Sequence, residues 1–367
     1  MPFSYVDTTW TTMPIESWPA EDLEAVSVCP ACGYGPRQLL YAALTDRVFF
    51  SAPGQWSLYA CKRCGVAFLD PRPTQPSIGR AYRTYYTHSA LTSDPTRSSS
   101  LSLKWKMLLR NDYLNHAFGY RLCPALPAGR HLLSQRRQRQ YGRWVRHLQL
   151  PAGRPALLDV GCGNGKFLAQ MTFLGWHARG IEPDPIAAAA ARDSGLDVQE
   201  GFLTEATAEA GRFDAATLSH VIEHVHSPTE MLALCHRCLR PGGVLWIGTP
   251  NVDALGHQRF GASWRGLEPP RHLTLFNTTT LTRLLLDAGF ADVLQPAPDS
   301  VGEWFHLASA AMSHGLDPEK WADLPREVQA KERAAAREAH ARTTTEPHRT
   351  EELVLMVRKP GPSVCAA

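Results

Sequence analysis

Residues 157–165, with the sequence LLDVGCGNG, constrain the fold more than any other stretch. An apolar run that ends in three glycines at alternate positions predicts a short buried strand, a tight turn and a helix that begins at Lys166. Glycine has no Cβ, so it permits both a positive φ and close approach of the backbone to a ligand. The turn therefore predicts a nucleotide-like cofactor across the carboxyl end of the strand.

An alternation of strands and helices follows this turn. A second strand over residues 177–182 ends in Glu182, about 20 residues past the turn, where an acidic side chain accepts hydrogen bonds from a ribose diol. The last glycine comes one residue earlier than in the dinucleotide fingerprint GxGxxG, which argues against a pyrophosphate cradle. Further strands are expected near residues 196–199, 213–220 and 243–250. This order predicts an α/β fold with a doubly wound, Rossmann-like parallel sheet.

Five motifs in sequence order extend the pattern: residues 158–165, Glu182, residues 213–214, residues 220–225 (HVIEHV) and residues 239–243 (LRPGG). With them the chain resembles class I S-adenosylmethionine-dependent methyltransferases over roughly residues 136–300, and again in a final strand at 352–358. The resemblance implies a mostly parallel sheet of seven strands and S-adenosylmethionine as the cofactor.

The resemblance also implies a set of cofactor-binding residues. The methionine end is assigned to Asp159, Gly161, Cys162, Gly163 and Gly165, the ribose to Glu182, the adenine flank to Phe202, and a further contact to Ser219. The acidic residue that usually binds the adenine amine is missing beside Phe202, so that contact is expected from the backbone.

Two CxxC pairs lie upstream, Cys29 with Cys32 and Cys61 with Cys64. Each pair can aim two thiolates at one tetrahedral ion, so together they predict a closed structural zinc site. Buried or unrelated cysteines are the alternative. Residues 68–73 and Tyr85-Tyr86 add a resemblance to the zinc-ribbon head found before many bacterial methyltransferases of this kind, some of which act on sugars, cell-surface or natural-product intermediates.

The chain is accordingly expected to have three parts. Residues 1–75 form an extension and the zinc-ribbon-like unit, residues 76–135 form a linker and a helical segment that is a candidate lid, and residues 136–367 form the methyltransferase domain. Within the last part, residues 318–342 are rich in Ala, Glu and Arg and predict a solvated helix.

Two weaker patterns have structural explanations that we prefer. Cys235 and Cys238 form another CxxC, but they lie in an expected helix without a second pair, so core thiols are expected. The basic run at 136–146 resembles an RNA-contacting helix, yet Tyr141, Trp144 and Val145 share one helical face. An amphipathic helix that packs beneath the first strand explains this run more simply.

Composition limits partners and location. The formal net charge is +3, so electrostatics indicates no nucleic-acid partner. No apolar run approaches the roughly 20 residues needed to span a bilayer, and the first residues do not resemble a signal peptide. Nine cysteines, several in CxxC groups, favour a reducing compartment. A cytoplasmic protein without a membrane span is expected.

The candidate catalytic residues lie where the fourth strand ends. His220 is the first candidate for a general base, since a histidine titrates near neutral pH. Glu223 and His224 match part of the Glu-x-x-Glu-His motif by which some methyltransferases of quinone precursors and small RNAs hold a divalent cation, with His220 in place of the first glutamate. His272 is a candidate further ligand. The alternative is that Glu223 and His224 only cap the next helix.

The function that these patterns favour is methyl transfer from S-adenosylmethionine to an oxygen of a small molecule or sugar-containing intermediate. The alternatives are a zinc-ribbon RNA-binding protein or RNA-modifying methyltransferase, and a cofactor-binding regulator without chemistry. Arg271, near Trp264, either contacts an anionic acceptor or braces its own loop. The sequence specifies neither the acceptor nor the oligomeric state.

Overall fold

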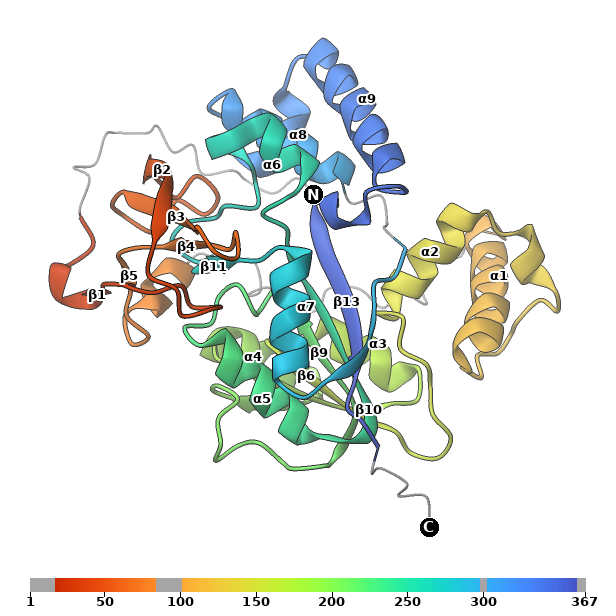
Figure 1. Cartoon of the computed structure of the whole chain (residues 1–367). Helices are drawn as coiled ribbons and strands as arrows, with labels where there is room; N and C mark the ends of the chain where they lie inside the picture. Colours follow the sequence, from red (N-terminus) through yellow and green to blue (C-terminus); the bar gives the residue numbers. More distant parts are fainter. Residues whose placement is uncertain (1–16, 84–100, 298–301, 362–367) are drawn as a thin grey trace.

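The computed structural model describes residues 17–83, 101–297 and 302–361. Its centre is a seven-stranded sheet in the order β12-β13-β10-β9-β6-β7-β8 (Figure 1). The strands are β6 (Ala156–Val160), β7 (His177–Glu182), β8 (Asp197–Glu200), β9 (Phe213–Ser219), β10 (Leu239–Pro250), β12 (Ala291–Leu294) and β13 (Glu352–Arg358). The five strands from β8 to β10 pair in parallel, and β13 runs antiparallel to both of its neighbours. The predicted doubly wound, mostly parallel sheet is confirmed.

Helices cover both faces of this sheet because successive residues of each strand point to opposite sides. Leu158 and Val160 face one core, which they share with α5 (Pro228–Cys238) and α7 (Thr278–Asp287). Leu157 faces the other core. The helices on that second face are α1 (Leu101–Phe118), α2 (Gln135–Trp144), α3 (Lys166–Phe173) and α4 (Pro185–Asp193).

Local sequence sets where these helices begin. Gly165 precedes α3 with φ +79°, a left-handed conformation that suits glycine. Asp184 caps α4, since its side chain accepts hydrogen bonds from the backbone N–H of Ile186 and of Ala187. Asn277 caps α7 in the same way through Thr280. The cap residues thus fix the turns that connect the sheet edge to its helices.

We call residues 17–83 the N-terminal module. Its strands are β1 (Leu23–Glu24), β2 (Arg37–Leu44), β3 (Trp56–Cys61), β4 (Ala67–Leu69) and β5 (Arg72–Pro73). β2, β3 and β4 form an antiparallel sheet whose fourth strand, β11 (Thr274–Leu275), comes from beyond β10. Val66 and Phe68 also belong to the same buried cluster as the central strands. The division at residue 75 stays a prediction, but the module and the central domain share a sheet and a core.

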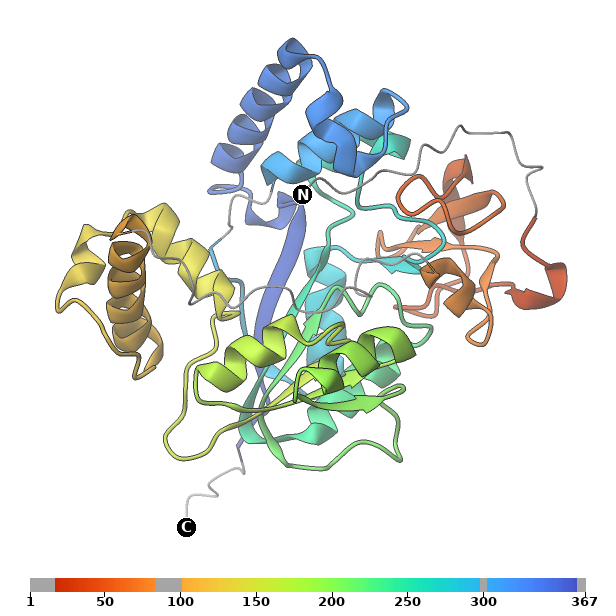
Figure 2. The same cartoon turned by 180° about the vertical axis from the view of Figure 1, so that it is seen from behind.

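A helical layer lies on the upper side of the molecule in Figures 1 and 2 and contains α6 (Leu255–Phe260), α8 (Gly302–Ser313) and α9 (Arg326–Arg342). The solvated helix expected over residues 318–342 is wrong in two respects. It is broken into a 3-10 helix, Pro318–Asp323, and α9, because Pro325 stands at the N-cap of α9. Glu332 and Ala336 of α9 are also buried. The remaining 3-10 helices are Ala20–Asp22, Ile78–Tyr82, Gly129–Leu132, Gly261–Ser263 and Pro347–Arg349.

The other weak patterns resolve as core structure. α2 ends at Trp144, and Val145 and Leu148 pack into the core below β6, as the amphipathic interpretation predicts. Cys235 and Cys238 are completely buried. Tyr85, Tyr86 and residues 84–100 of the expected linker lie outside the described residues. Within the described part of the chain, every helix is too short or too polar to cross a membrane.

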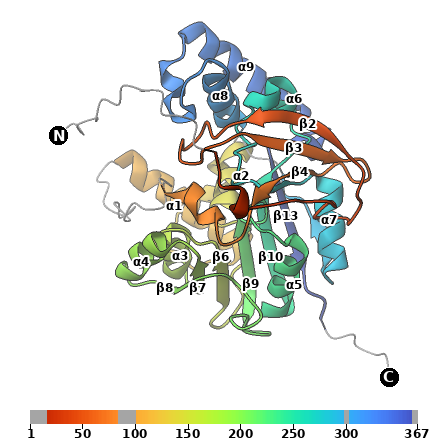
Figure 3. The same ribbon diagram turned by 90° about the vertical axis from the view of Figure 1, so that its left-hand side faces the viewer.

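Figure 3 shows the sheet of the N-terminal module in front of the central sheet, beside α6 and α7. The α1–α2 pair stands on the opposite side, as Figures 1 and 2 both show. The carboxyl ends of the parallel strands therefore lie between the N-terminal module, the upper helical layer and α2.

Candidate functional site

The glycine turn lies at the carboxyl end of β6. Gly161, Gly163 and Gly165 all have positive φ, between +55° and +79°. A Cβ at Gly161 would lie 2.5 Å from the Val221 side chain, and one at Gly165 would lie 2.4 Å from the Leu196 side chain. At both positions a larger residue would have an unfavourable positive φ and a side chain too close to its neighbour. The turn therefore needs its glycines, as predicted.

Glu182, at the end of β7, organises this turn. Its Oε2 accepts a hydrogen bond from the Gly163 N–H at 2.7 Å, and its Oε1 accepts one from the Asp184 N–H at 2.9 Å. Burial raises the pKa of Glu182, although both hydrogen bonds oppose this. A carboxylate has about four acceptor positions, so two remain for a ribose diol after these bonds.

The other predicted cofactor residues surround the same edge. Phe202 is half exposed just after β8, which suits an aromatic ring that packs against a planar base. Ser219 is partly buried at the end of β9. The Cys162 side chain is 8% exposed and packs into the core with Leu168, so only the backbone of Cys162 is placed to contact a ligand.

Asp159 is bound by Arg146, the last residue of the basic run at 136–146. Its Oδ1 accepts hydrogen bonds from Arg146 Nη1 at 2.5 Å and from Thr217 Oγ1 at 2.6 Å. The Arg146 guanidinium also lies over the Phe167 ring, 3.5 Å from its centroid. Asp159 therefore anchors the chain after α2 to the first strand, beside the glycine turn.

His220 directly follows β9 and has φ +53°. This is uncommon for a residue with a Cβ, and such strain clusters at functional sites. Its Nδ1 lies 3.3 Å from Glu223 Oε1 and its Nε2 lies 3.1 Å from Glu352 Oε1. The two carboxylates outweigh burial and raise the pKa of His220 to about 10. The ring is therefore cationic at neutral pH, which does not favour the predicted role as general base.

Glu352, at the start of β13, was not a sequence candidate. Arg143 Nη2 lies 2.6 Å from its Oε2, and His220 lies on its other oxygen. These ion pairs outweigh burial and lower the pKa of Glu352 to about 2. Its only signal in the sequence is a pair of acids, Glu351 and Glu352, at the head of an apolar strand.

Three of the four predicted catalytic residues come together. Glu223, His224 and His272 each offer a ligand atom, and these atoms lie within 4.8 Å of one another. Glu223 is completely buried; its Oε2 accepts a hydrogen bond from Thr249 at 2.9 Å, while its Oε1 lies 3.3 Å from His220 Nδ1 and has no closer partner among the residues that the structure describes. His220 contacts Glu223 but does not belong to this group, although it occupies the motif position at which a glutamate would be a ligand.

The two histidines of the group share one protonation pattern. His224 Nδ1 lies 2.9 Å from the carbonyl oxygen of Arg271, and His272 Nδ1 lies 2.7 Å from that of Gly266. A carbonyl can only accept, so Nδ1 carries the hydrogen in both rings and Nε2 keeps its lone pair in a neutral ring. Burial outweighs nearby carboxylates and lowers the pKa of His272 to about 4, so this ring is neutral at pH 7.

The sequence left two roles open for Arg271, contact with an anionic acceptor or bracing of its own loop. Its side chain is completely buried, which favours the bracing role. Its guanidinium makes two hydrogen bonds to Asp46, at 3.0 and 2.5 Å, and one to Glu268 at 3.0 Å. A bidentate arginine–carboxylate pair fixes orientation as well as distance. The loop that carries His272 is thus held to the N-terminal module.

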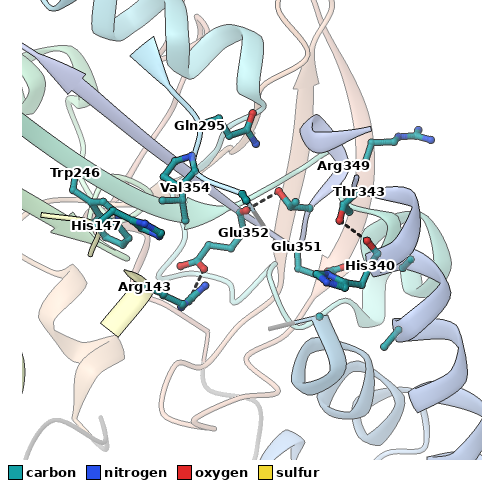
Figure 4. Close-up of a pocket in the computed structure, with 16 residues that line it drawn as sticks. Arg143, His147, Trp246, Gln295, His340, Thr343, Arg349, Glu351, Glu352 and Val354 are labelled. Atoms are coloured by element: carbon teal, nitrogen blue, oxygen red, sulfur yellow. Dashed lines mark hydrogen bonds and ion pairs between the residues drawn. The ribbon is translucent and has the colours of Figure 1, made fainter. Parts of the chain in front are cut away.

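A cavity opens on the other side of Glu352. It is a shallow cavity of about 50 Å³ that lies among α2, β10, β13, α9 and the end of β12 (Figure 4). Its lining includes Arg143, Trp246, His340, Arg349, Glu351, Glu352 and Val354. Figure 4 shows the Arg143–Glu352 ion pair along one wall. Because Glu352 also contacts His220, the cavity adjoins the carboxyl end of β9.

The four cysteines of the N-terminal module converge. Cys29 Sγ lies 3.6 Å from Cys64 Sγ, and Cys32 Sγ lies 3.5 Å from Cys61 Sγ. Sulfurs bonded at 2.3 Å to a tetrahedral zinc ion lie about 3.8 Å apart, whereas disulfide sulfurs lie about 2 Å apart. The separation therefore suits four ligands of one ion. Gly33 and Gly65 close the two knuckles with φ +68° and +73°, as expected.

Comparison with known proteins agrees with this geometry. Residues 133–295, which include the glycine turn, Glu182 and the Glu223–His224 pair, match the methyltransferase domain family. The chain contains a class I methyltransferase domain. The predicted resemblance is therefore confirmed, and the methyltransferase domain supplies the carboxyl-end site described above.

Curated relatives match part of the same region. The ubiquinone biosynthesis O-methyltransferase of Caulobacter vibrioides is 37% identical over 130 residues, which is 32% of this chain and 50% of that protein. The protein of the same name from Xanthomonas oryzae pv. oryzae is 37% identical over 102 residues, which is 26% of this chain and 43% of that one. The chain thus spans about half the length of the curated relatives it matches.

Solved structures resemble the chain more distantly. Phosphoethanolamine N-methyltransferase 2 of Haemonchus contortus has a TM-score of 0.43 at 13% identity, over 80% of this chain and 63% of that one. A possible histamine N-methyltransferase of Thermotoga maritima has a TM-score of 0.38 at 17% identity, over 70% of this chain and 93% of that one.

Proposed function

We propose that this protein transfers a methyl group from S-adenosylmethionine to an oxygen of a small molecule or sugar-containing intermediate. The observation that carries the proposal is the carboxyl-end site itself, where the glycine turn and Glu182 stand beside the Glu223, His224 and His272 group. The printed names of the relatives, which are O-methyltransferases of ubiquinone biosynthesis, support oxygen as the acceptor atom and a small molecule as the acceptor.

The residues present fit this cofactor. The backbone of residues 161–165 forms a cradle without side chains at its glycines, Glu182 has acceptor capacity left for the ribose, and Phe202 offers a half-exposed ring for the adenine. When bound, the cofactor supplies an activated methyl group on a sulfonium. The chain itself must then align the acceptor oxygen, keep water out and remove a proton.

We place the reacting oxygen of the acceptor next to His220, between the Glu223, His224 and His272 group and the cavity beside Glu352. Trp246 and Val354 give that cavity an apolar wall for the rest of the acceptor, while Arg143 and His340 supply polar contacts. Alignment of two reactants in such a cavity contributes about 7–11 kcal/mol to lowering a barrier. Both N–H groups of cationic His220 face carboxylates, so its contribution is a positive charge beside an acceptor oxygen that develops negative charge.

We propose further that Glu223, His224 and His272 hold a divalent cation. Glu223 Oε1 and a lone pair on Nε2 of each histidine are available to it. Such an ion lowers the pKa of a bound hydroxyl and so replaces a general base. This assignment suits a site in which the adjacent His220 is already protonated and so cannot accept the proton of the hydroxyl.

Structural zinc is proposed for Cys29, Cys32, Cys61 and Cys64. The four sulfurs leave no open position, so this ion would take no part in the chemistry. Thiolates of this kind persist in a reducing compartment, and we place the protein in the cytoplasm on that ground.

A nucleic-acid substrate is less well supported. Arg143 and Arg146, from the basic run at 136–146, pair with Glu352 and Asp159 inside the molecule. They are therefore not available to phosphates.

The proposal is tested by methyl transfer from labelled S-adenosylmethionine to a panel of phenols, catechols and sugar hydroxyls, with an RNA pool as comparison. We expect labelled product with hydroxyl acceptors, loss of turnover after treatment with a cation chelator that leaves the zinc content unchanged, and recovery with Mg²⁺ or Mn²⁺. Label in RNA alone would contradict the proposed acceptor, and full activity in the chelated enzyme would contradict the catalytic cation.

A further inference from the structure

The proposed cation site is built partly from the N-terminal module. His224 Nδ1 lies 2.9 Å from the hydroxyl of Tyr82, a residue 142 positions earlier in the chain. The same nitrogen lies 2.9 Å from the Arg271 carbonyl. Tyr82 belongs to the 3-10 helix Ile78–Tyr82, which closes the described part of the module. One ring nitrogen of a proposed ligand therefore has two partners, and one of them comes from the module.

The second partner is also fixed by the module. Arg271 makes its bidentate contact with Asp46, and its Nη1 donates a further hydrogen bond to the Ala81 carbonyl at 2.8 Å. Asp46 in turn accepts hydrogen bonds from the backbone N–H groups of Val48, Phe49, Ser51 and Ala52. This carboxylate is anchored in its own loop, so it sets the position of Arg271 and of the Arg271 carbonyl.

The sheet of the N-terminal module also holds the loop that bears His272. β11 begins two residues after His272 and pairs with β4, where Thr274 lies opposite Phe68. β4 follows the second cysteine knuckle directly. The side chain of Asn277 and that of Thr280 donate hydrogen bonds to the Cys64 carbonyl at 3.0 and 2.9 Å. The loop that bears His272 is therefore fixed at both of its ends to the N-terminal module.

We propose that Tyr82 is a positioning residue for the methyltransferase site. Together with the Asp46–Arg271 pair, it holds His224 with the hydrogen on Nδ1 and Nε2 directed at the cation. This inference rests on the cation site of the proposed function. Groups that hydrogen-bond the far nitrogen of a metal-bound histidine set its tautomer and ring orientation, and losing one typically lowers metal affinity or activity 10–100-fold.

The chain offers a matched control. The hydroxyl of Tyr41, also in the module, donates a hydrogen bond to His257 Nε2 at 3.0 Å in the methyltransferase domain, because His257 Nδ1 donates its own hydrogen to the Val252 carbonyl. His257 is absent from the group formed by Glu223, His224 and His272. Tyr82→Phe and Tyr41→Phe thus delete the same hydroxyl from the same kind of tyrosine–histidine contact between the same two parts of the chain, and only the first lies at the proposed site.

The experiment measures Mn²⁺ affinity of the full-length, zinc-loaded protein by electron paramagnetic resonance, with zinc content and S-adenosylhomocysteine affinity measured on the same samples. We expect Tyr82→Phe to weaken Mn²⁺ binding about 10-fold, since the Arg271 carbonyl remains, while zinc content and S-adenosylhomocysteine affinity stay unchanged. Tyr41→Phe should bind Mn²⁺ as the wild type does. Equal Mn²⁺ affinity in Tyr82→Phe and wild type, or an equal loss in both variants, would overturn the role of Tyr82.

A second readout separates this inference from the proposed cation itself. ¹⁵N shifts of the imidazole nitrogens report which nitrogen carries the hydrogen and how strongly that N–H is hydrogen-bonded. The Arg271 carbonyl keeps the hydrogen on His224 Nδ1 in every variant, so we expect the Nδ1 shift of His224 to move in Tyr82→Phe, where one of its two partners is lost, and to match wild type in Tyr41→Phe. If wild type binds no Mn²⁺, the catalytic cation is refuted, and a moved Nδ1 shift of His224 in Tyr82→Phe still supports positioning. An unchanged Nδ1 shift in Tyr82→Phe refutes positioning whether or not Mn²⁺ binds.

Discussion

Replacement of Arg271 by methionine tests the ionic contact that joins the N-terminal module to the methyltransferase domain. The guanidinium is completely buried and pairs with Asp46 and Glu268. Methionine fills much of the volume and removes the charge, so both carboxylates lose a partner. Breaking a buried ion pair on one side costs about 3–5 kcal/mol of unfolding free energy, because it leaves buried charge without compensation.

The structure places the loss at the lower end of that range. Asp46 keeps four backbone N–H donors, and Glu268 keeps Arg265 at 2.5 Å. We therefore expect Arg271→Met to lower the free energy of unfolding by about 3 kcal/mol at pH 7. Arg283, whose partner Asp287 lies 4.0 Å away with both side chains exposed, gives the matched control: Arg283→Met should change it by no more than about 0.5 kcal/mol.

The difference in unfolding free energy between wild type and Arg271→Met should depend on pH through the carboxyl of Asp46. Burial raises the pKa of Asp46, but Arg271 and the backbone N–H groups outweigh it and hold the pKa below its ordinary 3.8. A carboxyl with a lowered folded pKa contributes stability above its unfolded pKa, and this is lost as the pH falls through the folded pKa. The difference between wild type and Arg271→Met should therefore shrink as the pH falls below about 4.

The assay is urea unfolding followed by tryptophan fluorescence at pH 7 and at a series of lower pH values. A loss under about 1 kcal/mol at pH 7, or a loss no larger than that of Arg283→Met, would refute the bracing role of the buried pair.

Three further predictions follow from other parts of the structure. Removal of zinc should lower the thermal midpoint of the whole molecule in one transition, because β11 and the core around Phe68 are shared; an unchanged methyltransferase transition in calorimetry would contradict this. Burial raises the pKa of Glu351 to about 7, although hydrogen bonds from the N–H groups of Trp264 and Gly256 oppose this rise. The free energy of unfolding should therefore fall by about 3 kcal/mol as the pH rises from about 4.5 to 7. In urea unfolding, Glu351→Gln should show a smaller fall over this range, and an equal fall would exclude Glu351 as its source. Cys61→Ser should lower the zinc content measured by elemental analysis, while Cys235→Ser should not, because Cys235 is equally buried but does not belong to the four-sulfur group; equal zinc loss in both variants would contradict the assigned zinc site.

Much of the central sheet could be predicted because local signals coincide with it. The apolar run before Gly161, the acid that ends β7 and the apolar strand β13 all carry their pattern within a few residues. The two CxxC pairs likewise predict a four-sulfur cluster from spacing alone. In each case the residues that decide the structure are neighbours in sequence.

The rest depends on contacts between distant residues. The raised pKa of His220 comes partly from Glu352, which lies in another strand, so a histidine that titrates near neutral pH in isolation becomes a cation. The pairing of β11 with β4 joins segments about 200 residues apart, and two residues of strand carry almost no periodic signal. Arg146 ends a basic run that the sequence places on an amphipathic helix, but no local pattern predicts its ion pair with Asp159, which lies in another element.

The proposed methyl transfer requires that the glycine turn and Glu182 form a site for S-adenosylmethionine. Isothermal titration of the zinc-loaded protein with S-adenosylhomocysteine measures this directly, with Glu182→Ala beside it and Glu200→Ala, an exposed acid at the end of β8, as control. We expect saturable one-to-one binding that is retained in Glu200→Ala and weakened at least about 10-fold in Glu182→Ala, the loss of one charged hydrogen bond. Absence of binding in the wild type, or equal affinity in both variants, would contradict the central claim.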